Sequence, residues 1–136
     1  MTSNESIENS TKLTPKFDDN GLIPVITQDS KTGQVLMSAY MNAEALDQTI
    51  KTGLATYYSR SRKKLWKKGE QSGHIQKVDQ ILIDCDQDCV LLKVSVDAGQ
   101  CHVGYKSCFY RKINSQTKSL DFIAERIFDP DKVYKK

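Results

Sequence analysis

A chain of 136 residues, of which 38% are hydrophobic and 27% charged, is long enough for one compact domain and too short for two of ordinary size. Its net charge of +3 and isoelectric point near 8.6 fall short of the strongly basic balance typical of nucleic-acid-binding domains. No stretch reaches the roughly 18 uninterrupted apolar residues that a bilayer crossing needs, and the polar N-terminus lacks the apolar segment of a secretory signal, so we expect a cytoplasmic protein.

The N-terminal region predicts a tail followed by the start of a sheet. Residues 1–16 are rich in Ser, Thr, Asn and Lys and have no apolar period, so we expect a disordered tail and a single domain over residues 17–136. Short apolar runs at 22–27 and 35–40 flank a turn-forming segment at 29–33. This pattern predicts a β-hairpin.

The next segment has the signals of a helix. Asn42 is a favourable N-cap, and Gly53 is a favourable residue just after the last turn. Leu46 and Ile50 lie four residues apart and therefore share one face. We expect a helix that runs from Asn42 to about Thr52.

Short strand-like segments follow the helix. Residues 54–59 and 75–78 have an extended pattern, and the residues 60–73 between them form a basic loop. Residues 81–85 and 89–96 predict two strands around a tight acidic turn, with alternate valines and leucines on one face. The loop at 60–73 is long enough to suggest a functional role.

The C-terminal part predicts one more strand and a second helix. Residues 107–113 are compatible with a strand, and an amphipathic segment that starts at Ser119 places Leu120, Ile123 and Ile127 on one side of a helix. Together with the preceding elements, these predictions describe a mainly β (α+β) domain with about two helices.

Three aspartates recur at every second position in the acidic turn. An extended backbone would point Asp84, Asp86 and Asp88 to one side and Cys85 to the other. Carboxylates this close repel one another unless a cation lies among them, and oxygen ligands suit magnesium or calcium. A solvated acidic β-turn is the alternative interpretation.

All four cysteines, Cys85, Cys89, Cys101 and Cys108, lie in one part of the chain. In a reducing compartment such clustering favours metal binding over disulfides. Three thiolates and a water molecule leave zinc the open position that catalysis requires, whereas Cys89 or His102 as a fourth ligand would close the site. Buried thiols that bind no metal are also compatible with this spacing.

The basic loop surrounds one tryptophan, Trp66, with six cations: Arg60, Arg62, Lys63, Lys64, Lys67 and Lys68. Arginine forks bind phosphate in a bidentate way, so the loop is a candidate site for a phosphorylated ligand. A solvated charged face and an RNA-binding surface are the alternatives.

Long motifs in this chain, taken in order, closely resemble phosphoribosyl-AMP cyclohydrolases: VLMSAYMNAEAL, TYYSRSRKKLWKKGEQSGHIQKV, DCDQD and CHVGYKSCFYR. The resemblance extends from about Asn20 to Ile113. It implies hydrolysis of the N1–C6 bond in the adenine ring of N1-(5-phosphoribosyl)-AMP, a step of histidine biosynthesis that yields the formimino-AICAR ribonucleotide. Too few residues follow Ile113 for the pyrophosphohydrolase domain that some relatives carry, so we expect the monofunctional form.

The resemblance also implies two metal sites and a dimer. Aspartates at the positions of Asp84, Asp86 and Asp88 bind magnesium in that family. Cysteines at the positions of Cys85, Cys101 and Cys108 bind zinc, and the first of them comes from the other subunit of an intertwined homodimer. Cys89 matches no ligand position. We therefore expect one Zn²⁺ and one Mg²⁺ per subunit in a small, barrel-like sheet domain.

A mechanism follows from these expectations. Zinc-activated water is expected to attack C6 of the purine, as in the zinc deaminases. His102 is the first candidate for the proton shuttle and His74 the second, with ordinary polar histidines as the alternative. The expected substrate contacts are Arg60, Arg62 and Lys64 for the phosphates, and Trp66 for stacking on the base or packing in the core.

A zinc-stabilised RNA-binding module is the competing hypothesis. It accounts for the cysteines and the basic loop, but it assigns no role to the three aspartates. No nucleic-acid or membrane partner is expected for the enzyme.

Overall fold

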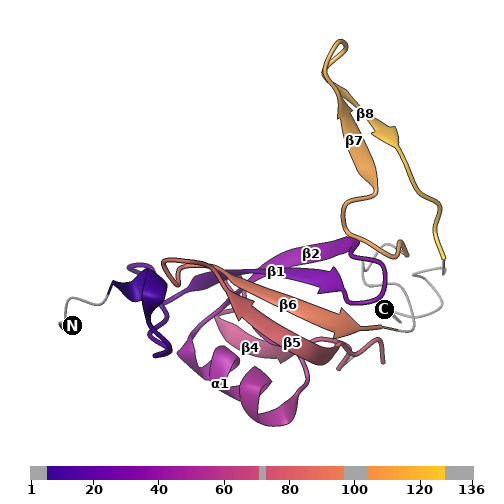
Figure 1. Ribbon diagram of the computed structural model, residues 1–136. Coiled ribbons are helices and arrows are strands. Elements are labelled where there is room, and N and C mark those ends of the chain that lie inside the picture. Colours follow the sequence, from indigo (N-terminus) through magenta and orange to yellow (C-terminus); the bar gives the residue numbers. More distant parts are fainter. Residues whose placement is uncertain (1–5, 71–72, 97–103, 128–136) are drawn as a thin grey trace.

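The computed structural model describes residues 6–70, 73–96 and 104–127, which fold mainly into β-strands (Figure 1). The elements in chain order are η1 (Ile7–Asn9), β1 (Ile23–Asp29), β2 (Val35–Met41), α1 (Ala43–Thr52), β3 (Thr56–Ser59), β4 (Lys64–Lys67), β5 (Lys77–Ile83), β6 (Val90–Ser95), β7 (Arg111–Asn114) and β8 (Ser119–Phe122). The predicted mainly β, α+β class is confirmed. No helix among the described residues has the length and apolar character that crossing a bilayer requires.

A four-stranded sheet in the order β2-β1-β6-β5 forms the body of the domain. β1 pairs with β2 and β5 with β6 in antiparallel fashion, so both predicted hairpins are confirmed, while β1 and β6 are parallel. Two further sheets, β3-β4 and β7-β8, have two strands each. All three sheets are open among the described residues, and the barrel-like closure stays a prediction.

The core lies on one face of the four-stranded sheet. Alternate residues are buried along β1 and β6, as the pleat of a half-covered sheet dictates. Figure 1 shows α1 and β4 lying together against one side of this sheet, and Ala45, Leu46 and Tyr57 from α1 and β3 are buried in the same cluster. Each buried Leu or Val contributes about 1.5–3 kcal/mol relative to an exposed one.

The helix begins and ends where the sequence predicts. Asn42 Oδ1 accepts a hydrogen bond of 2.8 Å from Ala45 N at the first turn. Gly53 follows the last turn with a left-handed φ of 74°, and its N–H donates to Thr49 O. Leu46 is buried, but Ile50 on the same face remains half-exposed.

The basic segment is a hairpin rather than a loop. β3 and β4 pair antiparallel, and the turn between them includes Lys63 with a positive φ of 55°. Leu65 and Trp66 pack against the core cluster, and this packing holds β4 in place. The prediction of a loop over residues 60–73 was wrong here because two packed side chains outweigh the run of lysines around them.

The predicted second helix is a strand. Asn114 Oδ1 accepts hydrogen bonds from the N–H groups of Gln116 and Thr117, and Lys118 adopts a left-handed φ of 58°. These local bonds form a tight turn, so the residues from Ser119 onwards pair back on β7. The helical period of the apolar residues was therefore misleading.

The β7–β8 hairpin projects away from the rest of the domain (Figure 1). We call residues 109–123 the arm. Its large apolar side chains are mostly exposed: Phe109 (55%), Ile113 (76%), Leu120 (51%), Phe122 (66%) and Ile123 (59%). A monomer in water would leave this apolar surface uncovered.

The N-terminal segment contacts the domain before residue 17. Gln87, at the turn after β5, accepts from Thr14 N through its side-chain oxygen at 2.7 Å and donates to Lys12 O at 3.0 Å. Its main-chain oxygen also accepts from Lys16 N. This part of the predicted tail thus has fixed partners, whereas residues 1–5 lie outside the described residues.

Candidate functional site

The acidic turn, residues 84–89, connects β5 to β6 and is closed by its own backbone. Asp84 N donates to Cys89 O, and Gln87 N donates to Asp84 O, each over 3.0 Å. Gln87 has a left-handed φ of 61°, which reverses the chain direction. Because the N-terminal segment binds the buried side chain of Gln87, the turn is held from both sides.

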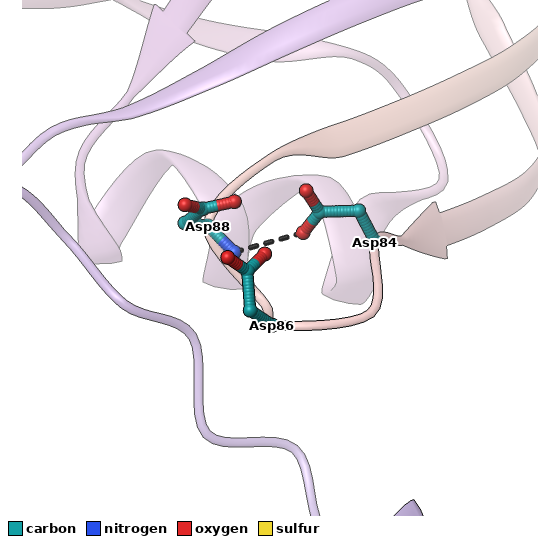
Figure 2. A group of neighbouring side chains, drawn as sticks. All are labelled: Asp84, Asp86 and Asp88. Atoms are coloured by element: carbon teal, nitrogen blue, oxygen red, sulfur yellow. Dashed lines mark hydrogen bonds between the residues drawn. The ribbon is translucent and has the colours of Figure 1, made fainter. Parts of the chain in front are cut away.

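The turn brings the three aspartates together (Figure 2). One ligand atom from each of Asp84, Asp86 and Asp88 lies within 4.8 Å of the others, and no other group of three or more potential metal ligands is found in the described parts of the chain. Asp84 Oδ1 accepts from Asp88 N at 2.9 Å and from Cys89 N at 3.1 Å. The convergence predicted from an extended backbone occurs, but a turn with a left-handed residue produces it.

The proximity of these carboxylates changes their affinity for protons. Side-chain hydrogen bonding raises the pKa of Asp88 to about 6, and the contact with Asp86 has a larger effect than the contact with Asp84. Partial desolvation raises the pKa of Asp84, but hydrogen bonds from Asp88 and from the Asp88 and Cys89 N–H groups outweigh it and lower that pKa. The cluster therefore retains a proton where an isolated aspartate would not, and a cation would replace that proton.

The oxygen atoms suit a hard divalent cation. Magnesium binds oxygen at about 2.0–2.1 Å in octahedral geometry, which places its ligands about 3–4 Å from one another. The ligand atoms of Asp84, Asp86 and Asp88, which lie within 4.8 Å of one another, are close to that spacing. The chemistry and spacing of this donor set fit a magnesium ion.

Cys108 has an exposed thiol on a fixed backbone. Its N–H donates to Leu36 O over 2.7 Å, and the buried Ser107 donates through Oγ to Val35 O over 2.7 Å. On either side, the rings of Tyr105 and Tyr110 stack with centroids 3.8 Å apart. Cys108 is thus at the tip of a rigid bend.

The other predicted thiol ligands lie elsewhere. Cys85 is exposed in the acidic turn, while Cys101 and His102 lie outside the described residues. Cys89 is half-buried, and burial raises the pKa of its thiol, which disfavours the thiolate that binds metal.

Cys85 and Cys108 lie at opposite edges of the sheet. Cys108 is anchored beside β2, at one edge, and Cys85 follows β5, at the other edge. Three strand spacings of about 4.8 Å separate the two edges by on the order of 15 Å, before any displacement along the strands is added. Two sulfur atoms on one zinc lie within about 4 Å of each other, because each Zn–S bond is about 2.3 Å.

The predicted phosphate-binding residues lie on the β3–β4 hairpin. The Arg60 guanidinium lies 4.2 Å from the centroid of the Tyr40 ring, which orients it by a cation–π contact. Arg62 lies in the turn, where its N–H donates to Ser59 Oγ, and Lys64 is exposed at the start of β4. The hairpin thus presents three cations near its turn.

Trp66 and His74 are both partly buried. Trp66 packs against Tyr57, with ring centroids 5.0 Å apart, and against the core cluster, so packing in the core is at least part of its role. His74 follows a chain reversal in which Gly69 approaches the main chain closely. A Cβ at Gly69 would lie 2.5 Å from Ile75 N, and its φ of 90° also requires glycine.

The sequence did not reveal two polar contacts near Cys108. The first is an ion pair of 2.9 Å between Lys106 Nζ and the buried carboxylate of Asp29. The second is a buried network in which Tyr57 donates to Gln76 Oε1 at 2.5 Å and lies 2.7 Å from Thr27 Oγ1. Both join residues far apart in the chain, so no local pattern signals them.

Comparison with known proteins indicates a small hydrolase. The sequence model of the phosphoribosyl-AMP cyclohydrolase family matches residues 37–110, more than half of the chain. A phosphoribosyl-AMP cyclohydrolase of Methanococcoides burtonii is 60% identical over 89% of this chain and 96% of its own length. Homologues with the same name from Rhodopseudomonas palustris (56% identity, 97% and 91%) and Chlorobium phaeovibrioides (54%, 100% and 98%) are similar over nearly their full lengths. The chain belongs to the phosphoribosyl-AMP cyclohydrolase family.

Proposed function

We propose that this chain hydrolyses the N1–C6 bond of the adenine ring in N1-(5-phosphoribosyl)-AMP, giving the formimino-AICAR ribonucleotide of histidine biosynthesis. The observation that carries this proposal is the family membership over residues 37–110, a region that includes all predicted site residues. In this proposal, the enzyme uses one zinc ion and one magnesium ion per subunit.

Magnesium binds to the acidic turn in this proposal. Asp84, Asp86 and Asp88 supply the oxygen ligands, and their convergence within 4.8 Å supports that assignment. The backbone bonds from Asp88 and Cys89 to Asp84 hold one carboxylate in a fixed orientation. The turn can then keep its shape before the ion arrives, which reduces the ordering that binding requires.

Zinc binds to Cys85, Cys101 and Cys108 and, when bound, supplies a hydroxide ion near neutral pH. The chain's own contribution is to present these thiols and to leave one coordination position open. The rigid bend around Cys108 supports this role, because a thiol on a fixed backbone loses little freedom when it binds metal. Cys89, with its raised pKa, has no part in binding zinc.

The zinc site is shared between two subunits of an intertwined homodimer. The separation of on the order of 15 Å between Cys85 and Cys108 within one chain supports this arrangement, because a single zinc cannot bind both. The exposed apolar arm supports it independently, since a partner would cover Ile113 and Phe122. In the dimer, Cys85 of one subunit joins Cys101 and Cys108 of the other.

The β3–β4 hairpin binds the substrate. Arg60, Arg62 and Lys64 contact the phosphates, and the cation–π contact with Tyr40 holds Arg60 in place for that purpose. Trp66 contributes to the hairpin mainly by packing against Tyr57. His102, adjacent to Cys101, transfers the proton to the departing nitrogen, and His74 is the second candidate for this role.

A ring-opening assay tests the proposed reaction. Purified protein is incubated with N1-(5-phosphoribosyl)-AMP, and the product is followed by its absorbance before and after treatment with a chelator. We expect turnover that the chelator abolishes and that zinc with magnesium restores. A protein that holds zinc, binds RNA tightly and opens no purine ring would instead identify an RNA-binding module.

A further inference from the structure

The segment that carries Cys108 is fixed to the β1–β2 hairpin by consecutive contacts. Ser107 Oγ donates to Val35 O, and Cys108 N donates to Leu36 O, both over 2.7 Å. One residue earlier, Lys106 Nζ lies 2.9 Å from Asp29 Oδ2. Three successive residues thus contact the same hairpin, although the last of them exposes its thiol.

Asp29 connects the two segments because its two oxygens have different partners. Oδ1 accepts from Lys31 N at 2.9 Å and thereby shapes the β1–β2 turn, while Oδ2 binds Lys106. The carboxylate is buried, with 6% of Asp29 exposed, whereas the Lys106 side chain is 37% exposed. A charge-assisted hydrogen bond to a buried carboxylate is stronger than a surface ion pair, and its loss leaves that carboxylate without a counter-charge.

The contact is an ion pair between residues far apart in the chain, and it joins this segment to β1. Ser107 and Cys108 bind main-chain oxygens of the adjacent strand, which fixes their distance from β2. The lysine reaches past them to the end of β1 and so fixes the direction of the segment. Without it, the segment would keep its hydrogen bonds to Val35 O and Leu36 O but would lose its charged contact with the end of β1.

We propose that the Asp29–Lys106 ion pair is a positioning device that holds the Cys108 thiol in the direction required for zinc binding. The proposal rests on the assignment of Cys108 as a zinc ligand. Groups that orient a metal ligand from behind typically change metal affinity by about 10–100-fold when they are removed. Because Lys106 acts from two residues away, we expect an effect at the lower end of that range.

The test measures zinc retention rather than turnover. Zinc-loaded dimers of the wild type, Lys106→Met and Asp29→Asn are mixed with a chromogenic chelator. We expect zinc release from both variants to be about tenfold faster than from the wild type. Asn at position 29 can still accept from Lys31 N, and methionine keeps the aliphatic length of Lys106, so both variants should fold.

Two further variants separate positioning from general effects of charge. Lys106→Arg keeps the cation and should restore wild-type release, whereas Lys31→Met removes a charge from the same turn but leaves the Lys31 N–H bond to Asp29 intact. In protein loaded with Co²⁺ instead of zinc, the sulfur-to-cobalt charge-transfer band should weaken in Lys106→Met and remain unchanged in Lys31→Met.

The outcomes distinguish this inference from the zinc assignment itself. If Cys108→Ser loses zinc while Lys106→Met retains it like the wild type, the ion pair has no positioning role and the assignment of Cys108 stands. If Cys108→Ser retains zinc with an unchanged charge-transfer band in its Co²⁺ form, Cys108 is not a ligand and both ideas fail.

Discussion

The two candidate metal sites differ in how many of their ligands a single chain brings together. The acidic turn assembles its three carboxylates within five residues of one hairpin, and its own backbone bonds hold it closed. The thiols lie at opposite edges of the sheet, and Cys108 is at the base of an arm with an exposed apolar surface. A local turn can therefore form one of the proposed sites in a monomer, whereas the proposed zinc site would need an assembly.

The largest expected effect separates ligand thiols from the remaining cysteine. Cys108→Ser should abolish turnover and release zinc, because an alcohol replaces a thiolate ligand. Cys89→Ala removes a half-buried thiol that matches no ligand position and should keep most activity and zinc. Metal analysis and the ring-opening assay check both variants. Equal loss of zinc in the two would contradict the assignment of the site.

Disrupting the arm should affect the thiol site alone. Ile113→Glu introduces a charge on a side chain that is 76% exposed in the monomer, so folding should be unaffected, while a dimer would have to bury that charge. We expect the dissociation constant of the dimer to rise at least about tenfold and zinc to be lost at low protein concentration, whereas magnesium binding persists.

Sedimentation of Ile113→Glu and of Thr117→Glu, which adds the same charge to the exposed turn of the arm, provides the comparison. Thr117→Glu should sediment as the wild type does. An Ile113→Glu variant that remains a zinc-loaded dimer would show that the apolar side of the arm is not an interface.

Asp86→Asn should affect the acidic turn alone. It removes one of three magnesium ligands, so we expect a higher magnesium concentration for half-maximal activity, with zinc content unchanged. Asp79→Asn is a suitable control, because Asp79 is exposed outside the turn, where it accepts hydrogen bonds of 2.6 Å from Ser30 and Ser95. Parallel loss of zinc and magnesium in Asp86→Asn would mean that a single site spans both regions.

The smallest expected effect is on the pH dependence of stability without metal. The pKa of Asp88 is raised from 3.8 to about 6 in the folded protein, so its contribution to stability is present below about pH 4 and is lost as the pH rises through 6. When a chelator has removed metal ions, Asp88→Asn should therefore unfold at a higher temperature than the wild type at pH 7.5. Near pH 4, the two proteins should unfold at similar temperatures. Thermal unfolding at the two pH values measures this. If the difference in unfolding temperature between Asp88→Asn and the wild type were the same at both pH values, the raised pKa of Asp88 would be contradicted.

Local chemistry explains what the sequence predicted correctly. The caps Asn42 and Gly53 determine the ends of α1, and the alternation of apolar residues along β6 determines which face is buried. The acidic turn was located for the same reason, although the left-handed Gln87, rather than an extended backbone, makes the aspartates converge.

Contacts between distant segments explain what the sequence did not predict. The segment from Ser119 has the apolar period of a helix, but the turn at Asn114 pairs it with β7. The Asp29–Lys106 ion pair joins the end of β1 to the segment before β7, and only the assembled sheet brings these residues together. Similarly, the packing of Trp66 on Tyr57 converts a basic loop into a hairpin.

The shared zinc site is tested most directly by mixing two inactive chains. Cys85→Ser and Cys108→Ser are refolded together, so that each mixed dimer has one site with both defects and one site with none. Random pairing makes about half of the dimers mixed, and half of their sites intact, so about a quarter of wild-type activity should return. If the mixture is as inactive as its parents, with mixed dimers confirmed by mass, the zinc site is not shared between subunits.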